Sequence, residues 1–231
     1  MATELIVALD TDDLSIARAW VSQLSPTVKW FKVGLQMFVK FGPDACRWVT
    51  DSGSRLFLDL KFHDIPNTVA GAVRSARNAG AEILTVHGGG GSAMLRQAVE
   101  SAGQEAIIAA VTVLTSLDTD DLHAVGVDRT PQDQVIRLAR LAHTCGVPAI
   151  VCSPHEVALV RNSFNREELK LIVPGIRPRT EGAAKDDQKR IMTPADAARA
   201  GADYLVVGRP ITQAADPLRT ASAILEEIAG A

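Results

Sequence analysis

Eight short apolar runs, rich in β-branched residues, recur along the chain. They span Leu5–Asp10, Trp30–Leu35, Arg55–Lys61, Ile83–His87, Ile107–Thr115, Ala149–Ser153, Leu171–Ile176 and Tyr204–Arg209. The runs are continuously apolar instead of alternating with polar residues, which is typical of strands that are covered on both faces. The pattern therefore predicts eight buried strands.

Most of these runs are followed by a segment with the periodicity of an amphipathic helix. The apolar stripes are Leu14, Ala17, Val21 and Leu24; Val135, Leu138, Ala139 and Ala142; and Leu218, Ala221, Ile224, Leu225 and Ile228. Gly80, Gly146 and Gly201 stand where helices are expected to end. Repeated strand–helix units in 231 residues predict an α/β protein with a single domain, a (β/α)8 TIM barrel over residues 1–231.

A doubly wound open sheet is the alternative architecture, and the turn after the first strand bears on it. Such a sheet commonly carries a glycine-rich phosphate-binding turn at that point. This chain has Asp10-Thr-Asp-Asp13 there, which offers no cradle for a phosphate. The barrel is therefore favoured.

Local residues predict how two of the helices begin. Gly88–Gly91 is interpreted as a turn that leads into Ser92 as a helix N-cap, with contact to a phosphate or another ligand as the alternative. After the third strand, Pro66 is expected to stop the strand, and Asn67 or Thr68 to cap the following helix.

Composition narrows the class of protein. With 47% hydrophobic residues the chain has enough apolar surface for a sizeable core, and its net charge of -3 argues against nucleic acid as the main partner. Cys46, Cys145 and Cys152 are an odd number without metal-ligand spacing, which suits a reducing compartment. The N-terminal segment lacks a signal-peptide pattern, and no apolar run is long enough to span a bilayer. We therefore expect a cytoplasmic protein that binds neither nucleic acid nor membrane.

Polar residues gather at the carboxyl ends of the predicted strands. In a (β/α)8 barrel these ends form one rim, where the active site lies. The residues at the strand ends are Asp10, Lys32, Asp59, Lys61, His87, Thr115, Ser116, Ser153, Arg177, Gly208 and Arg209. Because almost every strand contributes one of them, the sequence predicts a polar binding site at the mouth of the barrel.

The densest group of charges follows the third strand. Asp59 and Lys61 are two residues apart on that strand, so they are expected on one face with Cα atoms about 6.6 Å apart. His63 has the opposite parity, and Asp64 follows it. Buried charges are costly unless they are paired. A structural ion pair at the strand end and a catalytic cluster are the two interpretations.

A phosphate site is also expected at the rim. Barrels often bind phosphate between the loops after strands seven and eight. Those loops contain Arg177, the polar segment Arg179–Arg190 in a loop around 178–190, and Gly208-Arg209. Arginine presents a planar donor fork that matches phosphate. A rim salt bridge for Arg209 and a disordered surface loop in place of a lid are the alternatives.

The remaining histidines and cysteines indicate no further chemistry. His123, His143 and His155 lie in predicted helices and are expected at the surface or in packing, and Cys152 is expected in the core. No set of histidines and carboxylates has metal-ligand spacing, and no serine nucleophile motif is present. No metal site is expected.

The stretch Asp59–Thr68 resembles the signature of the orotidine 5'-phosphate decarboxylase family, whose members complete UMP synthesis. Further matching segments are Leu5–Asp10, Phe31–Gly34, Val111–Thr115, Pro174–Pro178, Asp187–Arg190 and Val207–Pro210. The short Asp-x-Lys-x-x-Asp core also occurs in sugar-phosphate relatives such as 3-keto-gulonate 6-phosphate decarboxylase and hexulose-phosphate synthase. The extension through Thr68, together with Arg177, Gln188 and Arg209, is what points to the orotidine family.

The resemblance implies that the substrate is orotidine 5'-monophosphate (OMP) and that no cofactor is used. Asp10 and Lys32 would hold the ribose hydroxyls. Lys32, Asp59, Lys61 and Asp64 would form the catalytic charge array beneath C6 of the pyrimidine, with Asp64 supplied by the second subunit of a homodimer.

The resemblance also implies three further groups of contacts. Thr68 would reach the neighbouring subunit's ribose across the dimer interface. Thr115 or the adjacent Ser116 would meet the pyrimidine ring, and the sequence leaves both open. The phosphate would be bound by Arg177, Gln188, Gly208 and Arg209.

Lys61 has the central role in the expected decarboxylation. Its ammonium would stabilise the carbanion that forms when carbon dioxide leaves C6, and would then protonate that carbon. A magnesium-dependent sugar-phosphate lyase with an enediolate intermediate is the alternative enzyme. A non-catalytic nucleotide-binding barrel is the alternative from another class, and an ammonium buried between carboxylates is not what a pure binder requires.

Overall fold

The computed structural model describes residues 2–178 and 191–231. Its eight strands are parallel, each pairs with the next along the chain, and the last pairs with the first. They are β1 (Glu4–Ala8), β2 (Trp30–Gly34), β3 (Arg55–Phe62), β4 (Ala81–His87), β5 (Ile107–Val111), β6 (Ala149–Val151), β7 (Lys170–Val173) and β8 (Tyr204–Val207). The predicted single-domain (β/α)8 barrel is confirmed, because the sheet is closed.

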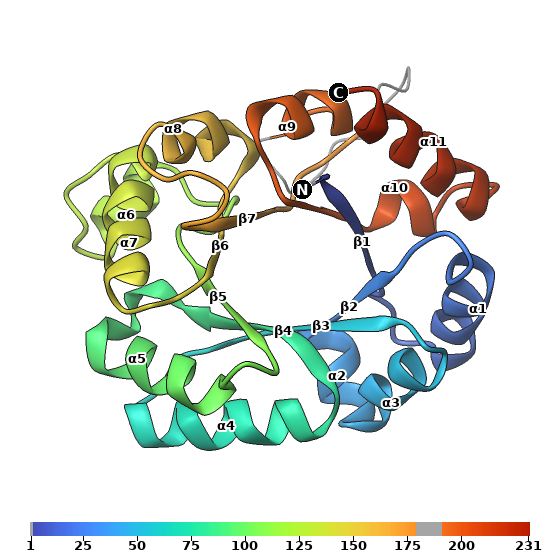
Figure 1. Ribbon diagram of the computed structural model, residues 1–231, viewed down its shortest axis with the longest axis horizontal. Helices are drawn as coiled ribbons and strands as arrows, with labels where there is room; N and C mark the ends of the chain where they lie inside the picture. Colours follow the sequence, from blue (N-terminus) through green and yellow to red (C-terminus); the bar gives the residue numbers. More distant parts are fainter. Residues whose placement is uncertain (1, 179–190) are drawn as a thin grey trace.

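Helices surround the ring of strands on its outer side (Figure 1). They are α1 (Leu14–Leu24), α2 (Leu35–Phe41), α3 (Asp44–Asp51), α4 (Pro66–Asn78), α5 (Gly91–Ala102), α6 (Thr119–Ala124), α7 (Pro131–Thr144), α8 (Val157–Arg161), α9 (Pro194–Ala200), α10 (Arg209–Thr212) and α11 (Pro217–Ala229). Short 3₁₀ turns, η1 (Gly88–Gly90) and η2 (Pro154–Glu156), precede α5 and α8. Within the described ranges, none of these helices has the length and apolarity to cross a membrane.

Alternate strand residues build two apolar layers. Outward-facing residues such as Val7, Phe31 and Leu58 pack against the helices in one large core. Inward-facing residues fill the barrel itself as a second, smaller core, formed by Ile6, Ala8, Trp30, Phe57, Ile83, Ala109, Ala149, Ile172, Tyr204 and Val206. This two-residue period decides which polar side chains reach the interior of the barrel.

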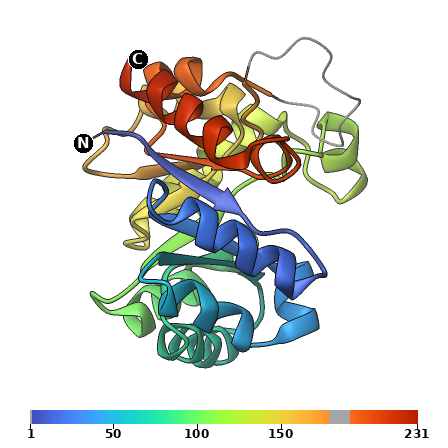
Figure 2. The ribbon, with the colours of Figure 1, turned by 90° about the vertical axis from the view of Figure 1, so that its right-hand side faces the viewer.

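The two ends of the chain meet where the barrel closes. Strand β1 pairs with β8 through the register Glu4–Tyr204 to Val7–Val207. Figure 2 shows β1 running between the N-terminal helix α1 and the C-terminal helix α11. Residues about two hundred positions apart in the sequence are therefore neighbours in the sheet.

Several predicted strands are too long at their carboxyl ends. The fifth was expected to reach Thr115, but β5 ends at Val111. The backbone N–H and hydroxyl of Thr112 still donate to the carbonyl of Val151, and then the chain turns, with the Leu117 N–H bonded to the carbonyl of Leu114. Thr115 therefore lies in the loop above the barrel.

Both predicted helix caps are wrong. Helix α4 starts at Pro66 with Ile65 in the cap position, so Asn67 and Thr68 lie inside its first turn. Proline favours this first helical position because it has no N–H to leave unsatisfied. Helix α5 starts at Gly91, so Ser92 is likewise inside the helix.

The predicted glycine helix stops are confirmed. Helices α4, α7 and α9 end within two residues of Gly80, Gly146 and Gly201. These glycines have φ of 88°, 79° and 108°. A residue with a side chain rarely adopts this backbone conformation, whereas glycine adopts it readily.

Candidate active site

Four charged side chains from three consecutive strands enter the barrel at its carboxyl end. Asp10 has the parity of Ile6 and Ala8, and Lys32 has the parity of Trp30. Asp59 and Lys61 have the parity of Phe57. The alternation of each strand therefore places all four on the inner face, and Asp59 and Lys61 share one face as the sequence predicted.

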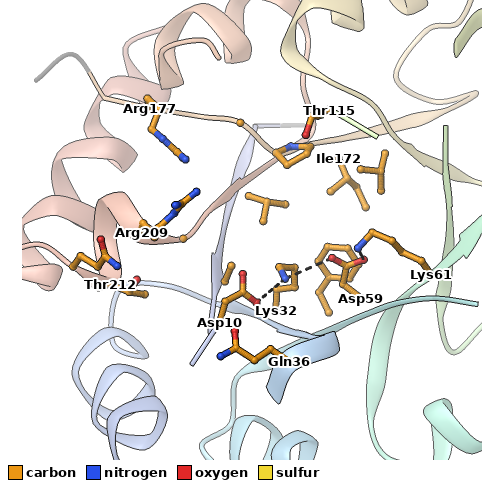
Figure 3. Close-up of a pocket in the computed structure, with 18 residues that line it drawn as sticks. Asp10, Lys32, Gln36, Asp59, Lys61, Thr115, Ile172, Arg177, Arg209 and Thr212 are labelled. Carbon is orange, nitrogen blue, oxygen red and sulfur yellow. Dashed lines mark hydrogen bonds and ion pairs between the residues drawn. The ribbon is translucent and has the colours of Figure 1, made fainter. Parts of the chain in front are cut away.

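The four side chains form a row of alternating charge, which we call the charge array (Figure 3). The ammonium of Lys32 lies 3.1 Å from Oδ1 of Asp10 and 3.5 Å from Oδ2 of Asp59. The ammonium of Lys61 lies 2.9 Å from Oδ1 of Asp59. Asp59 is thus shared between two lysines, one at each carboxylate oxygen.

Within the array, burial and neighbouring charges shift the pKa values in opposite directions, and the neighbouring charges have the larger effect. Burial alone would lower the pKa of Lys32, but Asp59 and Asp10 outweigh it and raise that pKa above its ordinary value. Burial alone would raise the pKa of Asp59, but Lys32 and Lys61 outweigh it and hold that pKa below its ordinary value. Lys32 and Asp59 are therefore both ionised at neutral pH.

Both ends of the array are more exposed than its middle, and the Asp10 side chain is 51% exposed. The side chains of Lys32 and Asp59 are 10% and 14% exposed, whereas that of Lys61 is 31% exposed. An ammonium has three N–H donors. Lys61 lines the cavity described below, so it presents charge and protons to whatever binds there.

The backbone at Lys61 is unusual. Its φ is 51°, and no other non-glycine residue in the described part of the chain has a positive φ. The left-handed conformation costs about 1–2 kcal/mol for a residue with a side chain. Strand pairing is irregular at the same place, since β3 shifts register against β4 between Leu58 and Phe62. Such strain commonly marks a functional site.

Gly34 provides the space that the array needs. A Cβ atom at this position would lie 2.8 Å from the Lys32 ammonium nitrogen and 2.9 Å from Oδ1 of Asp10. Both distances are below ordinary van der Waals contact, so any side chain here would push the Lys32–Asp10 pair apart. The glycine after Lys32 and Val33 is therefore required by the site itself.

A cavity of about 540 Å³ opens above the array. Its predicted lining residues are Asp10, Lys32, Asp59, Lys61, Thr115, Arg177, Gly208 and Arg209. Arg177 and Arg209 approach it from one side and the array lies on another (Figure 3). Of Thr115 and Ser116, it is Thr115 that lines the cavity. The cavity thus brings together predicted strand-end residues from both halves of the barrel.

The remaining predicted residues lie elsewhere. Asp64 and Thr68 are exposed at the start of α4 and do not line the cavity of their own chain. His87 and Ser153 lie outside the cavity lining as well. Gln188, with most of the predicted loop at 178–190, lies outside the described residues.

Two histidines stack beside the array. The rings of His63 and His87 are 4.9 Å apart and nearly parallel. Burial, and then the nearby His63 and Lys61, lower the pKa of His87. The His87 ring accepts a hydrogen bond from the Gly89 N–H, so the glycine-rich run is ordered by the strand that precedes it.

Sequence reasoning missed several residues of the site. Gln36 and Thr212 line the cavity from helices just past the strand ends, and Gln213 lines it from the position directly after α10. Thr85 donates to Asp59 from the middle of β4. An isolated threonine in an apolar strand carries no signal of such a role, whereas the polar residues one turn into α2 and α10 could have been found by extending the search past each strand end.

The arrangement suits an anionic ligand that gains negative charge near one end. Arg177 and Arg209 offer planar donor forks on one side of the cavity. On another side, Lys61 offers an ammonium that Asp59 positions. Developing negative charge beside this ammonium would be stabilised without reorganisation, because the lysine is already in place.

Known proteins match the chain over nearly its whole length. The family model described as "Orotidine 5'-phosphate decarboxylase / HUMPS family" matches residues 3–224. An orotidine 5'-phosphate decarboxylase of Anaeromyxobacter dehalogenans is 52% identical over 220 residues, which cover 95% of this chain and 96% of that protein. The enzyme of the same name from Moorella thermoacetica is 47% identical and covers 97% of this chain and 92% of its own length.

A solved structure agrees in fold and in name. The crystal structure of orotidine 5'-phosphate decarboxylase from Lactobacillus acidophilus superimposes with a TM-score of 0.85 at 35% identity, covering 98% of this chain and 99% of that one. The resemblance noted for Asp59–Thr68 thus extends through both sequence and fold. The chain belongs to the orotidine 5'-phosphate decarboxylase / HUMPS family.

Proposed function

We propose that the protein decarboxylates OMP to UMP and carbon dioxide in pyrimidine biosynthesis. The observation that carries the proposal is the alternating row of Asp10, Lys32, Asp59 and Lys61 along the wall of a cavity. The 52% identity to a protein named for this reaction supports the same substrate. We assign the reaction to the cytoplasm, in keeping with the free and buried state of all three cysteines.

The nucleotide binds across the cavity. Its phosphate lies toward Arg177, Gly208 and Arg209, which line the cavity. Gln188, which lies outside the described residues, is assigned to the same set from the family resemblance alone. Asp10 and Lys32 hold the ribose hydroxyls. Thr115 meets the pyrimidine ring, which directs C6 toward Lys61.

The chemical step breaks the bond between C6 and the carboxylate. The electron pair stays on C6, carbon dioxide departs, and the Lys61 ammonium transfers a proton to C6; the neutral amine then regains a proton from water. The barrier must fall by an amount toward the upper end of the range of about 8–23 kcal/mol that enzymes usually achieve. Two unit charges about 4 Å apart interact by about 4 kcal/mol at an effective dielectric near 20, so one ammonium contributes only part of this.

Asp59 makes a secondary contribution. Its carboxylate holds Lys61 at 2.9 Å and lies where it would repel the carboxylate of the bound substrate. That repulsion disappears as carbon dioxide leaves, which favours the transition state over the ground state. Binding of the remote phosphate offsets the repulsion, so weakening the phosphate grip lowers turnover as well as affinity.

Asp64 and Thr68 act in the site of a second copy of the chain in a homodimer. Both are exposed, and Ile65 between them is an apolar side chain that is 68% exposed. An exposed apolar residue among polar ones is typical of an interaction surface. The shared site is tested by mixing Lys61→Ala subunits with Asp64→Asn subunits, since a mixed dimer contains one intact site. Activity no higher than that of the two parents would contradict the shared site.

A sugar-phosphate lyase is the second candidate, because the matching family model covers HUMPS proteins as well. Those reactions pass through an enediolate that a magnesium ion stabilises, whereas the decarboxylation proposed here uses no metal or other cofactor. Chelation therefore separates the two candidates.

The deciding experiment follows the loss of OMP absorbance with purified protein treated with EDTA. Rapid conversion to UMP supports the proposal and the absence of a metal requirement together. A folded protein that leaves OMP unchanged contradicts the proposal. The assay is then repeated with magnesium and hexulose phosphates, and UMP binding without turnover would favour a non-catalytic nucleotide-binding protein.

A further inference from the structure

Thr85 lies opposite the strained segment that carries the charge array. Strand β3 pairs with β4 at Leu58–Leu84 and again at Phe62–Val86. Three residues of β3, 59 to 61, therefore face one residue of β4, which is Thr85. In a regular ladder one residue faces one, so β3 carries two extra residues here.

The hydroxyl of Thr85 connects the two ends of Lys61. The backbone N–H of Lys61 donates to Oγ1 of Thr85 at 2.8 Å. Oγ1 lies 3.0 Å from Oδ1 of Asp59, and that same oxygen accepts from the ammonium of Lys61 at 2.9 Å. The contacts form a closed ring that runs from the Lys61 backbone through Thr85 and Asp59 to the Lys61 ammonium.

The direction of each hydrogen bond in this ring is fixed. A backbone N–H is only a donor, and a carboxylate is only an acceptor. The hydroxyl must therefore accept from Lys61 and give its own proton to Asp59. A hydroxyl meets both requirements, whereas a methyl group in the same place meets neither.

The ring of hydrogen bonds is shielded from water. Thr85 is fully buried, so water does not replace the hydroxyl. Its side chain points into the barrel with the parity of Ile83, below the cavity and outside its lining. Thr85 therefore acts on the array and makes no contact with a ligand in the cavity.

We propose that Thr85 is a positioning residue for the reaction. Its hydroxyl holds Lys61 in the left-handed conformation at φ 51° and orients Asp59, so that the ammonium reaches the reacting carbon. The inference rests on the proposed decarboxylation for its effect on turnover. Its structural part, the conformation of Lys61, stands independently of the substrate.

The test compares Thr85→Val, which keeps the shape of the side chain, with Thr85→Ser, which keeps the hydroxyl. We expect kcat for OMP to fall by about 100-fold in the valine variant, as a misplacement of about 1 Å near the chemistry can produce. KM should change little, because Arg177 and Arg209 are untouched. The serine variant should recover most of the lost kcat.

Thr112→Val is the matched control. Thr112, directly after β5, is also a buried threonine, and its hydroxyl donates to the carbonyl of Val151 at 2.7 Å. It has no bond to the array, so this variant should lose stability while kcat stays near that of the parent. A similar fall of kcat in both valine variants would mean that any lost buried hydroxyl has this effect, and would overturn the inference.

Crystal structures of Thr85→Val and the parent separate this inference from the proposed function. If the parent protein does not decarboxylate OMP, the proposed function fails and the inference is judged on Lys61 alone. Loss of the left-handed φ or of the Lys61–Asp59 contact in the valine variant supports it. An unchanged Lys61, or a kcat for Thr85→Val that equals that of the parent, would overturn it.

Discussion

Asp59 and Asp203 are both aspartates held among cations, at opposite ends of the barrel. Asp203 precedes β8 at the amino end, where Arg161, Arg166 and Lys170 surround it and the Leu171 N–H donates to it. Asp59 lies at the carboxyl end between Lys32 and Lys61. The pairings are alike in charge, yet Asp59 lines the cavity described above and Asp203 does not.

The two sites differ in how far the hydrogen-bond donors of their cations are already used. Arg161 also donates to the carbonyls of Gly201 and Leu169, so its guanidinium is occupied in joining loops at the amino end. Lys61 lines the cavity, and its backbone is strained. A saturated buried ion network stabilises a fold, whereas an incomplete one at a rim is available to a substrate.

Removal of the Lys61 ammonium should have the largest effect on turnover. In Lys61→Ala the site loses its proposed proton donor and one of its positive charges, so we expect kcat to fall by roughly 10⁴- to 10⁷-fold. The cavity and the arginines remain, so UMP should still bind and Tm should change little. Steady-state turnover and calorimetric UMP titration measure the two quantities, and near-normal activity would sink the assignment of Lys61 as proton donor.

Removal of the Asp203 carboxylate at the amino end of the barrel should lower stability and leave turnover unchanged. Asp203→Asn leaves the surrounding cations without their partner, and breaking a buried ion pair costs about 3–5 kcal/mol of unfolding free energy. Turnover per folded molecule should be unchanged, because Asp203 is remote from the cavity lining. Urea unfolding and kcat below the transition test this, and a stable but inactive variant would break the comparison.

Crowding the array should have an intermediate effect. Gly34→Ala places a methyl group within 3 Å of both Lys32 and Asp10, so we expect kcat/KM to fall by about 10- to 100-fold. Gly71→Ala is the matched control, because its Cβ would meet nothing nearer than 3.9 Å and it lies in helix α4. That variant should gain about 0.4–1 kcal/mol of stability. Equal activity of the two variants would show that the array tolerates displacement.

The smallest expected effect is on the pH dependence of the unfolding free energy, through His87. The pKa of His87 is lowered in the folded protein, so protonation favours the unfolded chain. The stability associated with the neutral ring is present above the unfolded pKa of about 6.5 and is lost as pH falls through the lower folded value. In His87→Gln, the decline of unfolding free energy between pH 7 and pH 5 should be shallower, as measured by denaturant titration. His155→Gln, which removes an exposed histidine, is the control, and an equal change in both would remove His87 as the cause.

Much of this site could be predicted from the sequence because a barrel converts strand order into geometry. The parity of Asp59 and Lys61 sufficed to place both on one face of their strand, and the position of Arg209 after the eighth strand sufficed to place it at the same rim. These inferences need only the two-residue period and the closure of the sheet.

The sequence did not predict what depends on contacts between strands. The two extra residues of β3 and the left-handed Lys61 arise from pairing with β4, and no local pattern encodes them. The role of Thr85 could not be predicted for the same reason, since it depends on the residues of β3 that face it. The helix caps failed because Ser92 and Thr68 have suitable side chains, but the chain enters each helix one to three residues earlier.

Closure of the sheet between β1 and β8 also sets the order in which the protein becomes functional during synthesis. All four residues of the charge array have been translated once the third strand is made, whereas Arg177, Arg209 and the strand that seals β1 emerge last. Until then the edge of β1 remains unpaired, and such an edge is prone to pair with another chain. A ribosome-bound fragment therefore carries Lys61 without a complete pocket around it, and the C-terminal strand both protects the edge of β1 and completes the cavity.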